Sequence, residues 1–220
     1  INISSLNEKK ILYNLLCKKI ILMKKKNQFI FFENLKKNNE FKDIYKNQFF
    51  LSSDNVSSLS KEDLIEIDNS SSGAVVSKSC TLNPRKGNIH PRYYETELGS
   101  INSTGLANHG YDFYSAMGLS LKKPYILSVS SLNHEDTFKI LDDYSCKFNV
   151  IVEVNVSCPN IVGEPQLGYD MERLEKFIQG VFKVSGNLTV GLKLPPYFDK
   201  SHISKVADII EDDSLKVIGE

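Results

Sequence analysis

Short apolar runs rich in β-branched residues recur along the chain after residue 47. Runs of this length and composition are typical of strands that are buried on both faces of a parallel sheet. The pattern therefore predicts a central sheet of parallel strands. The predicted strands cover residues 49–53, 73–78, 125–130, 150–156, 188–194 and 215–218.

Amphipathic stretches of helical length separate these runs. Residues 60–67 predict a helix that begins at Ser60, with Asp63 three positions later in an arrangement close to a capping box. Further helical patterns cover residues 133–144, 170–184 and 199–212. Strands that alternate with helices of this length indicate βαβ units, which leaves a doubly wound sheet and a (β/α) barrel as candidates.

Polar residues at the ends of the predicted strands favour the barrel. No G-x-G-x-x-G or G-x-x-x-x-G-K turn, the usual mark of a doubly wound nucleotide fold, is present. In a barrel the carboxyl ends of the strands converge on one face, where the chemistry takes place. The sequence therefore predicts an α/β fold of the (β/α)8 TIM-barrel type, with about the first six βα units present. The polar strand-end residues are Lys78, Ser130, Asn155, Cys158 and Lys193.

Composition and charge divide the chain in two. The 220 residues are 41% hydrophobic and 25% charged, an ordinary globular balance, and the net charge is zero. The whole-chain charge thus gives no reason to expect nucleic acid or acidic lipid as a partner. Residues 1–47 nevertheless hold eleven Lys against four acidic residues. We predict that 1–47 is a poorly ordered Lys/Asn-rich extension and that 48–220 forms the partial barrel.

The basic segment offers no candidate membrane span. Lysines interrupt its apolar patches, so no run approaches the roughly 20 residues that a spanning helix needs. A mitochondrial-type address is an alternative interpretation of this segment, although the chain opens on Ile1. We expect a cytoplasmic protein without a membrane partner.

Cysteine and histidine usage gives no sign of a metal site. The cysteines form no C-x-x-C pair and no cluster with His, so we expect reduced thiols and no bound metal. None of the histidines stands at a predicted strand end or at metal-ligand spacing. The residues concerned are Cys17, Cys80, Cys146 and Cys158, and His90, His109, His134 and His202.

Five ordered motifs carry a family resemblance. In sequence order they are SSSGAVVSKSCT, NPRKGNIHPRYYETELGSINSTGLAN, VNVSCPN, GEPQLGYD and GLKLPPYFD. Together they resemble the class 1A dihydroorotate dehydrogenases from about residue 48 to about residue 218. A cysteine at 158 resembles class 1 rather than class 2, and PQLGYD is similar to class 1A. The resemblance implies a cytoplasmic, homodimeric FMN enzyme of pyrimidine synthesis that oxidises dihydroorotate to orotate and uses fumarate as electron acceptor.

The resemblance also implies a role for Cys158. Oxidising dihydroorotate requires a base for the C5 proton and an acceptor for the C6 hydride. Cys158 resembles the family's base, although an isolated cysteine is more often a small buried hydrophobe. Asn155 and Asn160 resemble residues that bind the pyrimidine ring, because an amide offers both donors and an acceptor. Asn102 joins them as a third amide.

The remaining site residues follow from the same motifs. By resemblance, Lys78 contacts both FMN and substrate, Ser79 contacts FMN, Asn155 serves both ligands, and Lys193 contacts the pyrimidine end of the flavin. A salt bridge across the barrel mouth is the alternative role for each lysine. Asn88 and Asn108 are interpreted as turn residues. The segment that resembles the substrate-binding loop consists of Asn102, Ser103, Thr104, Gly105 and Leu106.

Several positions depart from the family pattern. Thr104 and Ala107 replace Met and Pro, Glu164 reverses the charge of a loop lysine, and Ser131 stands where a glycine could leave room for the flavin. Asp54 and Asn55 stand where Ser and Gly are expected, and a carboxylate beside a reduced flavin is unfavourable.

The last residues also depart from the family pattern. The printed chain ends just after the sixth predicted strand, at 215–218, before the loops that hold a cofactor phosphate in such barrels. We therefore expect residues 1–220 alone not to retain FMN. The alternative function is a non-catalytic fragment or pseudoenzyme that keeps the scaffold.

Overall fold

The computed structural model describes residues 20–24, 60–70, 72–97, 99–146, 151–158, 166–186 and 188–211. The predicted strands at 49–53 and 215–218 lie outside this set. So do Cys17, Asp54, Asn55, Asn160 and Glu164. Predictions that concern them stay predictions.

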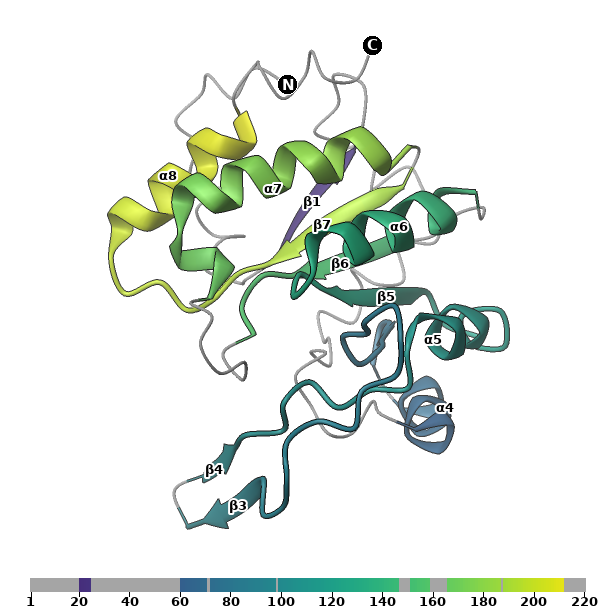
Figure 1. Cartoon of the computed structure of the whole chain (residues 1–220). Helices are drawn as coiled ribbons and strands as arrows, with labels where there is room; N and C mark the ends of the chain where they lie inside the picture. Colours follow the sequence, from purple (N-terminus) through teal and green to yellow (C-terminus); the bar gives the residue numbers. More distant parts are fainter. Residues whose placement is uncertain are drawn as a thin grey trace.

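The described elements alternate between strand and helix through most of the chain (Figure 1). The strands are β1 (Ile20–Lys24), β2 (Val75–Val76), β3 (Tyr93–Thr96), β4 (Gly99–Asn102), β5 (Tyr125–Ser130), β6 (Ile151–Asn155) and β7 (Thr189–Lys193). The helices are α4 (Lys61–Asn69), α5 (Tyr111–Met117), α6 (His134–Ser145), the 3₁₀ turn η2 (Leu167–Tyr169), α7 (Met171–Val184) and α8 (Lys200–Glu211).

The main sheet has the order β1-β7-β6-β5-β2. Strands β2, β5, β6 and β7 are parallel, and each pairs with the next along the chain. A doubly wound sheet would reverse its strand order at a switch point, whereas a barrel adds strands in sequence. The α/β prediction is confirmed, and this sequential order is that of a barrel segment.

Strand β1 was not predicted. Ile20–Lys24 pairs antiparallel with β7, from Ile20 opposite Lys193 to Lys24 opposite Thr189. It lies within the basic segment 1–47, the rest of which is outside the described residues. In a barrel, this edge of β7 is where the predicted strand at 215–218 would pair.

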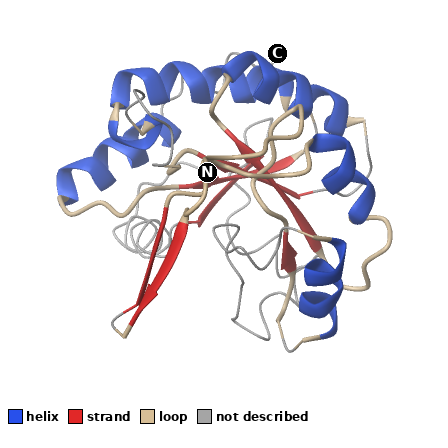
Figure 2. Ribbon diagram, turned by 60° about the horizontal axis from the view of Figure 1, so that its bottom comes forward, coloured by secondary structure: helices blue, strands red, loops and turns tan. Residues whose placement is uncertain are grey.

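The apolar core lies between the sheet and its helices. Figures 1 and 2 show α6 and α7 along one side of the sheet. The strand residues of this face alternate with those of the other face, as in any pleated strand. The strands contribute Leu127, Val129, Val152, Val154, Val190 and Leu192, and the helices contribute Ile140, Leu141, Phe177, Ile178 and Val181.

The opposite face of the same strands is buried but polar. The expectation of strands buried on both faces is therefore met, although the second face is not apolar. In a barrel this second face is the interior. Its polar residues are Ser128 and Ser130 on β5, Glu153 and Asn155 on β6, and Lys193 on β7, all of them buried. Nearer the start of the strands, Ile126 and Ile151 form a small apolar cluster with Ala74.

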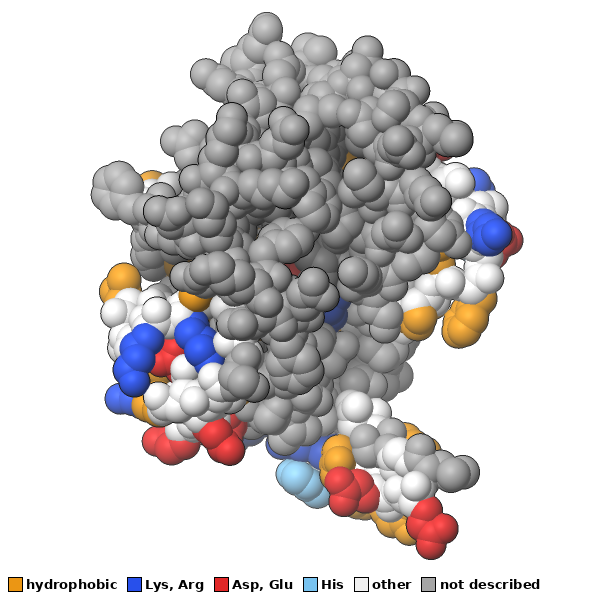
Figure 3. Space-filling model, turned by 180° about the vertical axis from the view of Figure 1, so that it is seen from behind, with side chains coloured by type: hydrophobic (Ala, Val, Ile, Leu, Met, Phe, Trp, Pro, Cys, Tyr) orange, Lys and Arg blue, Asp and Glu red, His pale blue; other side chains and the backbone are white. Residues whose placement is uncertain are grey.

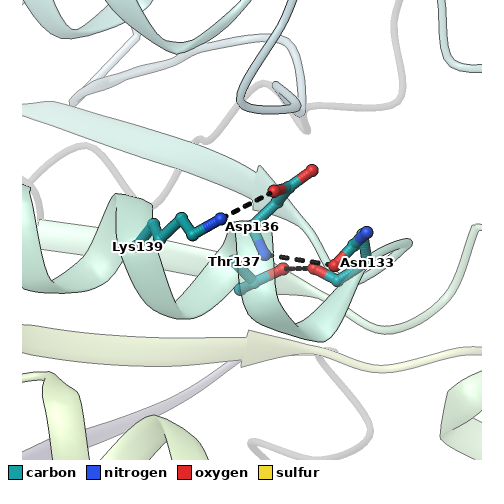
Figure 4. Close-up of polar contacts among 4 residues, drawn as sticks. All are labelled: Asn133, Asp136, Thr137 and Lys139. Atoms are coloured by element: carbon teal, nitrogen blue, oxygen red, sulfur yellow. Dashed lines mark hydrogen bonds and ion pairs between the residues drawn. The ribbon is translucent and has the colours of Figure 1, made fainter.

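The first turn of α6 holds the carboxyl end of β5. Figure 4 shows the polar contacts within that turn. The side chain of Asn133 caps the helix by accepting a 3.1 Å hydrogen bond from the backbone N–H of Asp136. Thr137 Oγ1 lies 2.8 Å from the carbonyl oxygens of both Asn133 and Ser130, so its single hydrogen is shared between these two acceptors. The helix therefore fixes the backbone of Ser130, a strand-end residue. The exposed pair between Lys139 and Asp136, at 3.8 Å, contributes little.

Helix α4 begins as predicted. Ser60 Oγ accepts from the N–H of Asp63 at 3.1 Å, and the Asp63 carboxylate accepts from the N–H of Ser60 at 2.9 Å, which completes a capping box. At the other end, the carboxylate of Asp68 accepts from the backbone N–H groups of Lys122 and Lys123. This contact ties α4 to the segment that leads into β5.

A two-stranded hairpin, β3–β4, projects from the body of the protein (Figures 1 and 3). Tyr93, Tyr94 and Ile101 are exposed on it. None of the helices in the described part of the chain is both long and apolar enough to cross a bilayer.

Candidate functional site

Three predicted strand-end residues lie in one row across the sheet. Ser130 of β5 is opposite Asn155 of β6, and Asn155 is opposite Lys193 of β7. Each ends its strand, so all three lie at the carboxyl edge and, by the pleat, on the polar face. The structure thus brings together residues that are separated by 25 and 38 positions in the sequence.

A chain of hydrogen bonds continues from this row into the polar face. Asn155 Nδ2 donates to Ser79 Oγ at 2.9 Å. The hydroxyls of Ser79 and Ser128 are 3.0 Å apart, and Ser128 Oγ donates to Glu153 Oε1 at 2.8 Å. These buried groups join the segment after β2 to β5 and β6. The predicted site residues Ser79 and Asn155 are therefore in direct contact.

The side-chain oxygen of Asn155 binds the segment that carries the predicted base, Cys158. Asn155 Oδ1 accepts from the backbone N–H of Ser157 at 3.0 Å and from its hydroxyl at 2.9 Å. Ser157 immediately precedes Cys158, which is half-buried. The amide therefore fixes the backbone that presents the thiol.

The two predicted lysines are both buried in the described structure. Lys78, next to Ser79, has 8% of its surface exposed, and Lys193 has 4%. Burying an ammonium group is costly unless other groups compensate it, and both lysines make interactions with the surrounding protein. Lys193 thus ends the row on the polar face and Lys78 adjoins Ser79 in the sequence, and two buried cations at these positions favour an anionic or electron-rich ligand.

The segment 102–106 divides between the hairpin and the body. Asn102 and Ser103 are exposed, Thr104 is partly buried, and Gly105 and Leu106 are buried. The structure places the first two at the end of the hairpin rather than in the row of strand ends. Their predicted contacts with substrate stay predictions, as does that of Asn160.

Asn88 holds this segment from the hairpin side. Its Nδ2 donates to the carbonyl oxygen and the hydroxyl of Ser103 at 3.0 and 3.1 Å, and its backbone N–H donates to the carbonyl of Thr104. A Cβ atom at Gly105 would come within 2.3 Å of Asn88 Oδ1, and Gly105 has φ +66°. Glycine is therefore required at Gly105 for both backbone conformation and space.

Asn108 closes the base of the same loop. Its Oδ1 accepts from the N–H groups of Thr81 and Gly110 at 3.2 and 2.8 Å, and its Nδ2 donates to Leu106 O at 2.8 Å. The contacts of Asn108 with Leu106 and Gly110 are those of a turn residue, whereas its bond to Thr81 and the bonds of Asn88 to Ser103 join segments that are far apart in the sequence.

Ser131, which follows Ser130 at the end of β5, makes hydrogen bonds to β6. Its hydroxyl and backbone N–H both donate to the carbonyl of Asn155, at 2.9 and 3.3 Å. The hydroxyl therefore links β5 to β6. Whether this side chain crowds a flavin stays a prediction.

The thiols described by the structure differ in reactivity. Burial raises the pKa of the Cys80 thiol from 9.0 to about 12, so it remains protonated at physiological pH. Cys146 is exposed at the end of α6. Cys158 alone among Cys80, Cys146 and Cys158 follows the strand-end row.

Sequence reasoning missed Ser128 and Glu153. Each lies two residues before a predicted site residue in the same strand, Ser128 before Ser130 and Glu153 before Asn155. The signal was present, since polar and apolar residues alternate in YILSVS and VIVEVNV. Period-two alternation puts successive polar residues on one face.

Comparison with known proteins identifies the relatives of this chain. A sequence model of the family described as dihydroorotate dehydrogenase matches residues 37–219. The dihydroorotate dehydrogenase (fumarate) of Trypanosoma brucei brucei is 40% identical over 170 residues, which cover 74% of this chain and 54% of that protein. That of Lachancea kluyveri is 38% identical over 176 residues, covering 77% and 56%.

A protein of Streptococcus uberis that is provisionally named dihydroorotate dehydrogenase A (fumarate) is 45% identical over 157 residues, covering 69% of this chain and 50% of that protein. The chain therefore spans about half the length of the curated relatives it matches. The family match covers most of the chain, and three relatives exceed the identity at which common descent and fold are secure. The chain belongs to the dihydroorotate dehydrogenase family, whose fold is a TIM barrel.

Proposed function

We propose that the protein containing this chain oxidises dihydroorotate to orotate with FMN, in pyrimidine biosynthesis, and passes the electrons to fumarate. The observation that carries the proposal is the row Ser130, Asn155 and Lys193, joined to Ser79 and followed by Cys158. Family membership supports the reaction class, and the relatives named for fumarate support the electron acceptor. On the same family grounds we propose a cytoplasmic homodimer.

In this proposal Cys158 takes the C5 proton of dihydroorotate. Its thiolate form is the base, and the proton passes from carbon to sulfur as the substrate loses its C6 hydride. The bonds from Ser157 to Asn155 hold the backbone before Cys158, so that the thiol is presented at the end of β6. This fixed approach reduces the entropy that the reaction must lose.

The polar face fits a flavin by the chemistry of its donors. Lys78 and Lys193 would hold the ring as cations, and Ser79 and Asn155 would line it. FMN, when bound, supplies the acceptor for the C6 hydride. The lysines would stabilise the negative charge that a flavin gains on reduction.

The substrate in this proposal lies between the strand ends and the loop 102–106. Asn155 and Asn160 would pair with the N–H and C=O edges of the pyrimidine, and Asn102 would supply a third amide. Lys78 would face the substrate carboxylate. Ser103, Thr104, Gly105 and Leu106 would line this side, with Gly105 allowing close approach of the backbone.

Anaerobic mixing of dihydroorotate with the FMN-loaded, full-length protein that contains this chain tests the proposal. We expect the flavin absorbance to bleach on mixing and to return when fumarate is added. If the flavin bleached but did not recover its absorbance, the proposed oxidation of dihydroorotate would be supported and the proposal that fumarate is the electron acceptor would be wrong. A protein that binds FMN but shows no bleaching would overturn the proposed reaction and favour a scaffold without catalytic activity.

A further inference from the structure

The hydrogen bonds on the polar face form a chain in which each hydroxyl donates toward the same end. The acceptor at that end determines this direction. Ser128 has one hydroxyl hydrogen, and that hydrogen is donated to Glu153 Oε1 at 2.8 Å. In the 3.0 Å contact between Ser128 and Ser79, the Ser128 oxygen must therefore accept and the Ser79 hydroxyl must donate. The order of donation runs from Ser79 to Ser128 to Glu153.

This direction reaches the amide of Asn155. Because the Ser79 hydroxyl donates to Ser128, its oxygen is the acceptor for Asn155 Nδ2 at 2.9 Å. An amide flipped by 180° would face that hydroxyl with an oxygen and would lose the bond. It would also turn its NH₂ group toward the N–H of Ser157. The Ser79 hydroxyl and the Ser157 N–H therefore select the same orientation of the Asn155 amide, one from each side.

The permitted orientation leaves one hydrogen for a ligand. Of the two hydrogens on Asn155 Nδ2, one is donated to Ser79. The second has no acceptor among the residues that the structure describes, in a side chain that is 2% exposed. A buried donor of this kind favours an acceptor such as a ring carbonyl.

We propose that Glu153 is a positioning residue, which acts through Ser128 and Ser79 to lock the Asn155 amide with one N–H directed at the bound ring. The identity of that ring rests on the proposed function. The hydrogen-bond chain itself does not, because it is present in the protein alone. Glu153 touches neither substrate nor cofactor in this account, and its effect is transmitted by the order of donors and acceptors.

Three substitutions in the FMN-loaded full-length protein separate this role from general support of the fold. Glu153→Leu removes the final acceptor, Ser128→Ala breaks the chain one step earlier, and Glu153→Gln keeps a carbonyl oxygen that can accept from Ser128. The matched control is Val154→Ala. Val154 is buried next to Glu153 in the sequence, but the side chain of Val154 lies on the apolar face. This substitution should lower thermal stability without altering the hydrogen bonds that run from Ser79 through Ser128 to Glu153.

The first measurement is orotate affinity, followed by the change in flavin absorbance. We expect Glu153→Leu and Ser128→Ala to weaken binding about tenfold, the loss of one directed hydrogen bond, and Glu153→Gln to stay within about threefold of the wild type. Val154→Ala should bind orotate as the wild type does. Wild-type affinity in both Glu153→Leu and Ser128→Ala would overturn the proposal.

The second measurement needs neither orotate nor activity. With ¹⁵N-labelled asparagine, the side-chain NH₂ signals of Asn155 are assigned by their loss in Asn155→Ala. We expect these signals to shift, and their hydrogens to exchange faster with water, in Glu153→Leu and Ser128→Ala but not in Val154→Ala. Unchanged signals would overturn the inference. The wild type could fail to bind orotate while these signals shift as expected. In that case the proposed substrate would be wrong, and the positioning role of Glu153 would still be supported.

Discussion

The side-chain amide of Asn155 donates a 2.9 Å hydrogen bond to the hydroxyl of Ser79, a residue 76 positions earlier in the chain. Both groups are buried, so removing the hydroxyl leaves an amide N–H without its partner. We expect Ser79→Ala to lower the free energy of unfolding by about 1–3 kcal/mol. Urea denaturation of the full-length protein measures this change. Ser115→Ala, which removes an exposed hydroxyl on α5, should change it by less than about 0.5 kcal/mol. Equal stability for the two variants would show that the buried contact contributes nothing.

Replacing the proposed base should slow one step and leave binding intact. We expect Cys158→Ala to reduce the rate of flavin reduction by dihydroorotate about 10²-fold or more, with unchanged FMN content. In the wild type the rate should rise with pH, because only the thiolate can accept the C5 proton. Stopped-flow absorbance under anaerobic conditions measures both effects.

The control for this substitution is Cys146→Ala, at an exposed thiol that ends α6. It should reduce flavin at the wild-type rate. If Cys158→Ala did the same, the thiol would have no part in the proton transfer.

Stability should fall at high pH because buried thiol and phenol groups resist ionisation, among them Cys80 and Tyr144. Burial raises the pKa of Cys80 from 9.0 to about 12 and that of Tyr144 from 10.0 to about 12. Between these values the unfolded chain binds fewer protons than the folded one, so stability decreases as pH rises from about 9 to 12. Each group contributes a slope of up to about 1.4 kcal/mol per pH unit.

Cys80→Val isolates one part of this slope. The variant keeps an apolar side chain of similar size and removes the thiol. Urea denaturation between pH 8 and pH 11 should show a shallower loss of stability for Cys80→Val than for the wild type. Parallel curves would mean that ionisation of Cys80 does not oppose the folded state.

A side chain at position 105 should disturb the loop that follows the hairpin. Gly105 has φ +66°, and an added Cβ would come within 2.3 Å of Asn88 Oδ1. We expect Gly105→Ala to cost about 1–3 kcal/mol of stability and to weaken orotate binding. The comparison is Gly99→Ala, where φ is +141° but nothing lies within 4 Å of the new Cβ.

Both variants carry backbone strain, and only Gly105→Ala adds the collision with Asn88. Calorimetric binding of orotate to the FMN-loaded protein, together with urea denaturation, separates the two effects. A Gly99→Ala protein that lost as much orotate affinity as Gly105→Ala would remove the special role of Asn88.

The regular elements of the barrel segment were predictable because their patterns are periodic. The ranges predicted for β5, β6, β7, α6, α7 and α8 agree with the structure to within about two residues at each end. The short helix α5 was not predicted, since Gly110 precedes it and offers no side-chain cap. Strands β3 and β4 were missed for a different reason. The exposed residues of β3 bury no face, so no alternation of polar and apolar residues marks it.

The site was predictable only in part. Lys78, Asn155 and Lys193 could be identified because polar residues at the ends of buried strands are unusual. The link from Asn155 to Ser79 could not, because it depends on the register of three strands, and register appears nowhere in the sequence of one strand. Glu153 was passed over for a related reason. A single glutamate within an apolar run gives no indication of which hydroxyl it will accept from.

The narrow base of the loop after β2 has a practical consequence for protein engineering. Arg85 and Asn108 exchange backbone hydrogen bonds of 2.9 and 3.0 Å, so the chain leaves and re-enters the body at one place. Between these residues the hairpin stands away from the strand ends (Figure 1). A fluorophore attached at its turn should therefore report on the segment 102–106, which lies on the same side of the Arg85–Asn108 bridge as the turn, while the bridge separates the label from the row of Ser130, Asn155 and Lys193.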